Sequence, residues 1–211
     1  MAGLREKQKV ARKQRILEAA TILFKRDGYD KTRIEDIAEV AEVSTGTTYN
    51  YYHSKADILI AVVSMEVEEI LLAGATIVDS PHASVVGALN TLIALYYEHS
   101  LVYLDKEMWR MAMAFSIQRP QTPFSKRYTD LDKRIREQVA SLIQALQLKG
   151  MVKTDIDHSV MAEIIFNNLN MMFIEFAKCD AMTIEELKAA VARQVTPLAL
   201  LISTKNPAPK K

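Results

Sequence analysis

Residues 45–51 form a short polar run without charged side chains. The run reads Thr-Gly-Thr-Thr-Tyr-Asn-Tyr, so it offers hydroxyls, phenols and one amide. Hydroxyls and phenols can donate hydrogen bonds to phosphate oxygens, threonine and tyrosine can touch thymine methyl groups, and asparagine can pair with adenine through two hydrogen bonds. Gly46 costs a helix about 1 kcal/mol relative to alanine, and its bare backbone suits close approach to a partner. These residue types predict contact with DNA.

Helix start signals surround this run. Ser44 can cap the helix that carries residues 45–51, because its hydroxyl can accept a hydrogen bond from a free backbone N–H of the first turn. Thr32 and Glu35 have the spacing of a capping box for an earlier short helix, and Ser54 can cap a later one. Two short helices separated by about three residues match a helix-turn-helix, whose second helix enters the DNA major groove.

Apolar spacing sets the inward faces of the two short helices. In the first helix, apolar residues recur with the period of one buried face, at Ile34, Ile37, Ala38 and Ala41. In the second helix, Thr48 and Tyr52 lie four residues apart and are predicted to face inward. The other positions of the second helix are then available to a partner.

The whole sequence predicts an all-α protein. Helical patterns separated by breakers are expected over residues 5–26, 55–78, 81–99, 105–118, 124–149, 158–178 and 183–202. Pro81 suits the first position of its helix, and Thr183 with Glu186 forms a capping box for the last one. We expect a DNA-binding domain over residues 1–60, a second helical domain over residues 61–204 and a disordered tail over residues 205–211.

The composition limits the expected cellular location and the expected partners of the protein. The chain has 211 residues, of which 49% are hydrophobic and 25% charged, enough for a substantial core. No apolar run approaches the ~20 residues that span a bilayer, so no membrane partner is expected. The single cysteine, Cys179, cannot form an internal disulfide, which favours a reducing cytoplasmic location.

Positive charge is concentrated at the N-terminus. The chain carries 27 basic and 26 acidic residues, a formal net charge of +1. Within residues 5–15, however, Glu6 is the one acidic residue against Arg5, Lys7, Lys9, Arg12, Lys13 and Arg15. Such a cluster is often a solvated helix face, and beside a helix-turn-helix it is equally suited to attract phosphates.

The segment from about Ile16 to Leu59 resembles the DNA-binding domain of the TetR (tetracycline-repressor-like) family of bacterial regulators. The matching pieces are ILEAATILFKRDGYDKT, IEDIAEVAEVS and TGTTYNYYHSKADIL. The family pattern Val-Ser-x-Gly-x-x-Tyr-x-Tyr/His-Phe-x-x-Lys is met by Val43, Ser44, Gly46, Tyr49, Tyr51, Tyr52 and Lys55. The departures are Glu42 in place of a turn glycine, Tyr52 in place of phenylalanine and Thr48 in place of a larger aliphatic residue.

The resemblance implies an N-terminal three-helix DNA-binding domain, a C-terminal helical ligand-binding and dimerisation domain, and a ligand-responsive regulator, by default a repressor. It assigns base-edge contacts to Thr45, Gly46 and Asn50. It assigns contacts with the DNA backbone to Thr32, Ser44, Thr47, Tyr49, Tyr51 and Lys55, and we add Arg33 to the expected DNA-binding residues. The partner would be a double-stranded, pseudo-palindromic operator bound by a homodimer.

The second domain is expected to hold the effector and the dimer interface. The resemblance implies a cavity among the middle helices, for which we predict the lining residues Tyr96, Trp109, Met113, Phe166 and Asn170. Their character favours a small apolar or amphipathic effector. The helices at 124–149 and 158–178 carry more apolar residues than one subunit covers easily, so we expect them to pair across a two-fold axis.

Catalytic and metal-binding motifs are not evident. The four histidines lack the i, i+4 spacing of a helical metal site, and the sequence holds no glycine-rich phosphate loop or nucleophile elbow. We therefore expect no enzyme activity, no catalytic residues, no metal and no cofactor. The alternative to a regulator is a helical interaction or scaffold protein that keeps the helix-turn-helix as a structural relic. The sequence does not identify the effector, the operator or the regulated genes.

Overall fold

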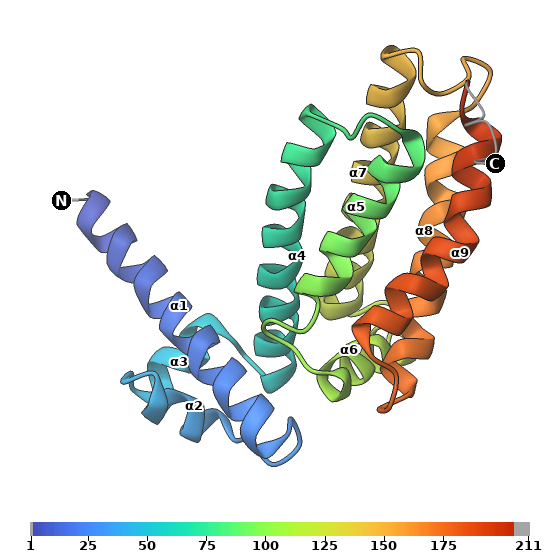
Figure 1. The fold of residues 1–211 in the computed structure, drawn as a ribbon. Helices are drawn as coiled ribbons and strands as arrows, with labels where there is room; N and C mark the ends of the chain where they lie inside the picture. The colour runs from blue at the N-terminus through green and yellow to red at the C-terminus, as the bar shows by residue number, and fades with distance from the viewer. Residues whose placement is uncertain (1, 205–211) are drawn as a thin grey trace. The chain divides into compact units, whose positions relative to one another are not determined.

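The computed structural model describes residues 2–204, and within them the chain is built from helices (Figure 1). They are α1 (Ala2–Asp27), α2 (Ile34–Val40), α3 (Thr45–Tyr51), α4 (Lys55–Asp79), α5 (Val85–His99), α6 (Lys106–Gln118), α7 (Pro123–Leu148), α8 (His158–Lys178) and α9 (Ile184–Ile202). The all-α prediction is confirmed. The predicted tail at 205–211 lies outside the described residues.

Most helix ends follow the local signals in the sequence. The Ser44 and Ser54 hydroxyls accept hydrogen bonds from the amides of the residues three positions ahead, and Thr183 and Glu186 form their capping box. Gly28 ends α1 with φ +84° and Gly150 follows α7 with φ +70°, left-handed conformations that favour glycine.

Two start predictions are wrong. The fifth helix was expected from Pro81, but α5 begins at Val85, where the Ser84 hydroxyl caps the amide of Gly87. A serine cap satisfies a free helix amide, which an N-terminal proline cannot do. Thr32 does not cap α2 either: Arg33 is the N-cap residue, and its amide donates to the Asp36 carboxylate at 3.1 Å.

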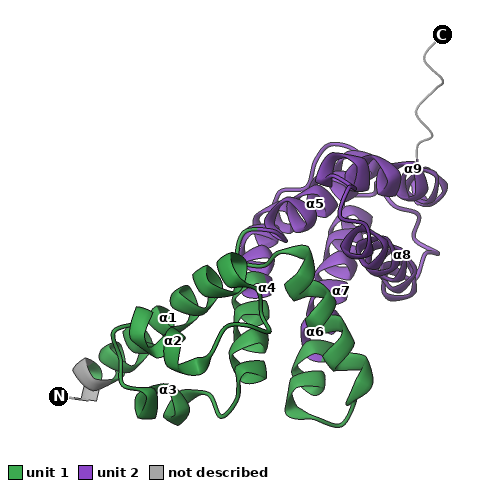
Figure 2. Ribbon diagram, turned by 90° about the horizontal axis from the view of Figure 1, so that it is seen from below, with its two compact units in different colours: residues 1–66, 102–129 green, residues 67–101, 130–211 purple. Residues whose placement is uncertain are grey.

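The chain forms two compact units (Figure 2). Unit 1 comprises residues 1–66 and 102–129, and unit 2 comprises residues 67–101 and 130–211. The expected domains were divided at a single point near residue 60. The compact units are discontinuous instead, because residues 102–129 pack with the N-terminal helices.

In unit 1, α2 packs on α1 and α3 packs on α2. The C-terminal half of α1 supplies a buried face of Ile16, Ala19, Ala20, Leu23 and Phe24, which meets the buried Ile37 and Ala38 side of this three-helix arrangement. The N-terminal half of α1 extends beyond α2 and α3 (Figure 1). The three helices therefore hold one another by a small apolar core at one end of α1.

Unit 2 has a larger apolar core. Helix α9 packs against both α5 and α8, and the core includes Leu89, Leu92, Leu142, Ile165 and Phe176. Near the end of α9, the amide of Lys153 donates to the Ile202 carbonyl and the amide of Thr204 donates to the Met151 carbonyl, both at 2.9 Å. These bonds fix the α7–α8 connection to the C-terminal end of α9.

One helix corrects the expectation that no segment approaches the length of a membrane span. Helix α8 is 21 residues long and apolar enough, by length and composition, to cross a bilayer. It also packs Ala162, Ile165, Leu169 and Phe176 into the core of unit 2. A core helix of a soluble protein has the same composition, so α8 by itself is weak evidence for a membrane.

Candidate nucleic-acid interface

Helix α3 is anchored by one buried side. Thr48 is fully buried, and Tyr52, the residue that follows the helix, is 9% exposed. Burial raises the pKa of the Tyr52 phenol to about 12, with a smaller contribution from Tyr51. Both residues face inward as predicted, so the orientation of α3 about its own axis is fixed by packing.

The remaining side of α3 carries the predicted DNA-binding residues. Gly46, Tyr49 and Asn50 are exposed, while Thr45, Thr47 and Tyr51 are half-buried. A Cβ atom built on Gly46 meets no described atom within 4 Å, so packing within the chain does not require glycine there. The Thr47 and Ser44 hydroxyls lie 2.8 Å apart and share a hydrogen bond. This face presents uncharged donors, acceptors and a bare backbone segment.

The turn before α3 contains an unfavourable backbone conformation. Glu42 has φ +52°, in the left-handed region that glycine adopts without steric cost. This is the position at which the resemblance anticipated a turn glycine. Its side chain is exposed and lies 3.7 Å from the Arg15 guanidinium of α1.

Thr32 is placed differently from the prediction. Its side chain is 3% exposed, and its hydroxyl donates to the Gly28 carbonyl at 2.8 Å. The hydroxyl closes the turn between α1 and α2 and is turned away from solvent. A phosphate contact by Thr32 stays a prediction. Arg33, one residue later, is exposed and lies 3.5 Å from the Glu35 carboxylate.

Lys55 is also tied to the turn between α1 and α2. Its ammonium donates to the carbonyls of Tyr29, Asp30 and Thr32 at 2.6, 3.0 and 3.1 Å. It lies 4.4 Å from the centroid of the Tyr29 ring, within cation–π range. Burial lowers the pKa of Lys55, and the charge of Asp30 partly opposes that shift. In the sequence, Lys55 was singled out because it matches the last position of the family pattern. That match does not predict hydrogen bonds to these three carbonyls.

The basic part of α1 reaches α3. Residues 6–15 are exposed along their whole length, and the Lys13 ammonium lies 6.0 Å from the centroid of the Tyr51 ring. With the Arg15–Glu42 contact, this places two basic side chains of α1 beside α3 and the turn that precedes it. The sequence reported the charge cluster, but the Lys13–Tyr51 contact joins residues 38 positions apart and had no local signal.

The five predicted effector-lining residues fall in both units. Trp109 and Met113 belong to α6 of unit 1, whereas Tyr96, Phe166 and Asn170 belong to α5 and α8 of unit 2. Tyr96 is buried, and its phenol donates to the Gln138 side chain at 2.8 Å. Burial raises the pKa of Tyr96 far above its usual range. The predicted pocket itself stays a prediction.

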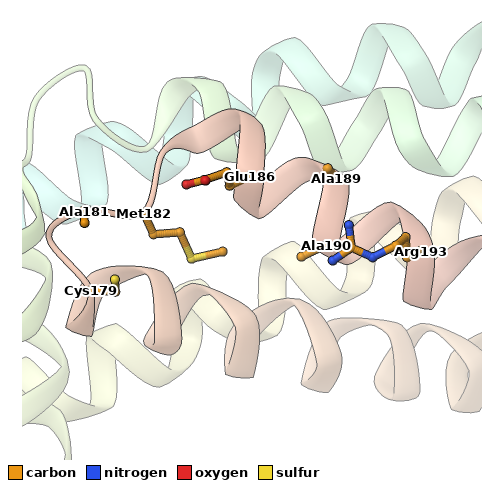
Figure 3. A pocket seen from close by; sticks show the side chains of 7 residues that line it. All are labelled: Cys179, Ala181, Met182, Glu186, Ala189, Ala190 and Arg193. Atoms are coloured by element: carbon orange, nitrogen blue, oxygen red, sulfur yellow. The ribbon is translucent and has the colours of Figure 1, made fainter.

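Other hollows lie within the single units. One of about 550 Å³ lies between the end of α8 and the start of α9, lined by Cys179, Ala181, Met182, Glu186, Ala189, Ala190 and Arg193 (Figure 3). In unit 1, a hollow of about 320 Å³ lies between the start of α4 and the α6–α7 turn, with Asp57, Phe115, Arg119 and Phe124 among its walls. Both are lined by residues other than the five predicted.

The geometry defines a class: a helical protein with a helix-turn-helix and a second helical unit. Residues 16–62 match the sequence model of the family "Bacterial regulatory proteins, tetR family". A 59-residue stretch is 37% identical to the HTH-type transcriptional repressor KstR of Rhodococcus jostii, covering 28% of this chain and 28% of that protein. Residues 16–62 therefore form a DNA-binding domain of the TetR family, and the resemblance seen in the sequence is confirmed.

Solved structures extend the likeness to the fold of the whole chain. A TetR-family regulator of Mesorhizobium loti has a TM-score of 0.71 at 22% identity, covering 92% of this chain and 97% of that one. The TetR-family repressor FadR of Thermus thermophilus, solved with lauroyl-CoA, has a TM-score of 0.66 at 21% identity, covering 94% and 100%. These identities show a shared fold. By sequence, this chain spans about a quarter of the length of the KstR relative.

Proposed function

We propose that this protein is a transcriptional regulator, most simply a repressor, that binds a pseudo-palindromic operator through α3. The observation that carries the proposal is the exposed, uncharged face of α3, on a helix held by the Ser44 cap and by buried Thr48 and Tyr52. An isolated surface helix gains solubility from charged residues, so an uncharged polar face is better explained by a groove of duplex DNA.

The roles within this surface follow from side-chain chemistry. Asn50, with Thr45 and Gly46, would meet base edges, because an exposed amide can bond to both adenine N6 and N7. Ser44, Thr47, Tyr49, Tyr51 and Arg33 would contact the backbone. The basic turns of α1 would add phosphate attraction beside Tyr51, which supports the phosphate reading of that cluster over a merely solvated face.

A homodimer is part of the proposal, with a revised interface. The exposed side chains of α8 include Val160, Ile164 and Met171, which share one face of the helix. Helix α9, which packs against α8, carries the exposed Leu201. The exposed positions of α7 within unit 2 are mostly polar: Asp130, Lys133, Glu137, Ser141 and Gln144. We therefore propose pairing through α8 with α9 rather than through α7 with α8. Two reading helices ~34–36 Å apart would then match successive major grooves.

The proposed effector is a small apolar or amphipathic molecule bound by the second domain, and its binding would lower operator affinity. The methionine and aromatic content of α6 and α8 supports this class. The lauroyl-CoA complex of Thermus thermophilus FadR indicates that this fold can accept an acyl chain. Operator affinity that stays constant across a panel of acyl-CoA and other amphipathic molecules would count against the effector part of the proposal.

The decisive experiment selects binding sites from genomic DNA fragments and measures affinity for the enriched sequence by fluorescence anisotropy. Asn50→Ala should relax base preference at one operator position and cost about 1–3 kcal/mol there. Asn90→Ala, at a half-buried position of α5 outside both α3 and the proposed dimer surface, is the matched control and should leave affinity unchanged. If no fragment is enriched, the operator proposal is wrong and the scaffold alternative gains support.

The dimer is tested separately by sedimentation. Ile164→Glu places a charge in the exposed apolar row of α8 and should shift the protein toward monomers. Ser141→Glu adds the same charge to the exposed face of α7 and should leave the dimer intact. The opposite pattern would restore the α7–α8 interface.

A further inference from the structure

The ammonium of Lys55 uses all of its hydrogen-bond donors within unit 1. A lysine ammonium has three N–H donors, and those of Lys55 point to three backbone carbonyls at 2.6–3.1 Å. The face of the Tyr29 ring supplies a fourth contact at 4.4 Å. A phosphate contact would require Lys55 to leave carbonyls that already satisfy it.

The turn that receives Lys55 is itself fixed from several sides. The Thr32 hydroxyl bonds to the Gly28 carbonyl, and Gly28 adopts φ +84°. The Tyr29 ring packs against Phe24 of α1 and Phe115 of α6, with centroid distances of 5.2 and 5.8 Å. Lys55 thus bonds to a rigid part of the domain.

Lys55 is also the first residue of α4, and α3 ends at Tyr51, four residues earlier. Fixing the start of α4 to the α1–α2 turn limits the positions that the end of α3 can take. The bonds made by Lys55 therefore contribute to the orientation of α3.

We propose that Lys55 is a positioning residue that holds the start of α4 on the α1–α2 turn and so sets the presentation of α3, and that it is not a phosphate contact. The proposal rests on the proposed operator binding for its effect on DNA. Its structural part, the attachment of α4 to the turn, can be measured without DNA.

The first test uses substitutions. Lys55→Met should weaken operator binding by about tenfold or more, since hydrogen bonds made by a charged donor are the strong ones. Lys31→Met removes the same charge from an exposed position of the same turn and is the matched control. Loss of a phosphate contact reduces the slope of log affinity against log salt by ~0.9. For Lys55→Met we expect a slope equal to that of Lys31→Met.

Lys55→Arg sharpens this test. Arginine keeps the charge and binds phosphate well, but its planar guanidinium cannot place three donors on carbonyls gathered around one point. Lys55→Arg should therefore bind DNA as weakly as Lys55→Met. Wild-type affinity in Lys55→Arg, or a slope lowered by ~0.9 beyond the control in Lys55→Met, would overturn the proposal.

The second test uses the unsubstituted protein and so does not depend on a variant that folds. Acetic anhydride labelling, read by peptide mass spectrometry, should modify Lys55 more slowly than Lys31, and addition of operator DNA should not change the Lys55 rate. Fast labelling of Lys55 that DNA then suppresses would show a phosphate contact and overturn the proposal. If no fragment binds, operator binding has failed, while the labelling rates without DNA still test the attachment of α4.

Discussion

The helix-turn-helix segment of residues 42–48 in unit 1 and the core of unit 2 differ in how well their residues suit the local structure. Within residues 42–48, Glu42 has a left-handed backbone, Gly46 occupies a helix position where a Cβ would meet open space, and Thr48 buries a hydroxyl without a partner among the described residues. The core of unit 2 is mostly apolar and contains ring pairs such as Phe173–Phe176. Locally unfavourable choices are expected at functional sites, where a partner rather than the fold selects the residue.

The largest expected effect lies in the unit 2 core. Phe176 is 1% exposed, and its ring stacks on Phe173 with centroids 5.9 Å apart. Phe176→Ala should lower the free energy of unfolding by about 3–5 kcal/mol, because it leaves a cavity in a packed core. Urea denaturation followed by circular dichroism measures this. Leu72→Ala, at an exposed site on α4 in the same unit, should change stability by less than about 1 kcal/mol. Equal losses in the two variants would mean that the core is not the source of stability.

The next prediction concerns a buried carboxyl group in unit 2, whose core is otherwise mostly apolar. Burial raises the pKa of Asp132 in α7 to about 7, and nearby Arg136 only partly offsets this. The folded state therefore holds a proton that the unfolded state releases near pH 4, so stability should fall as pH rises from about 4 to about 7. Asp132→Asn should remove this decline and add about 2–4 kcal/mol at pH 8, with no gain at pH 4. Thermal unfolding across this pH range measures the difference, with Asp155→Asn as the exposed control.

Within residues 42–48, Thr48→Val should stabilise the protein. The methyl replaces a buried hydroxyl that has no partner within residues 2–204, and desolvation of such a group costs about 1–3 kcal/mol. Thr47→Val is the matched control and should destabilise, because the Thr47 hydroxyl bonds with Ser44. A loss of stability in Thr48→Val would mean that the hydroxyl finds a partner in solution, and the contrast between the units would weaken.

The smallest expected effect is that of Gly46→Ala, which should change stability and operator affinity in opposite directions. Gly46→Ala should stabilise α3 by about 1 kcal/mol, since alanine is the better helix former and its Cβ meets open space. Under the proposed function, the same methyl should weaken operator binding, because it stands on the face that approaches DNA. Thermal unfolding and anisotropy on one preparation measure both. Higher stability with unchanged affinity would place Gly46 outside the DNA interface.

The sequence determined what depends on neighbouring residues. Helix starts at Ser44, Ser54 and Thr183 were predictable because a capping hydroxyl bonds an amide only three residues away. The inward positions of Thr48 and Tyr52 followed from helical periodicity. The start of α5 was missed because proline and serine both signal a helix start, and local sequence did not decide between Pro81 and Ser84.

Only the tertiary structure decided which distant groups meet. It bonded Lys55 to carbonyls 23–26 residues away, turned the Thr32 hydroxyl inward, and joined residues 102–129 to the N-terminal helices. It also gave α7 a polar exposed face while leaving apolar residues of α8 exposed. Hydrogen bonds and burial between distant segments depend on how the helices pack, and helical periodicity fixes only the face of each helix.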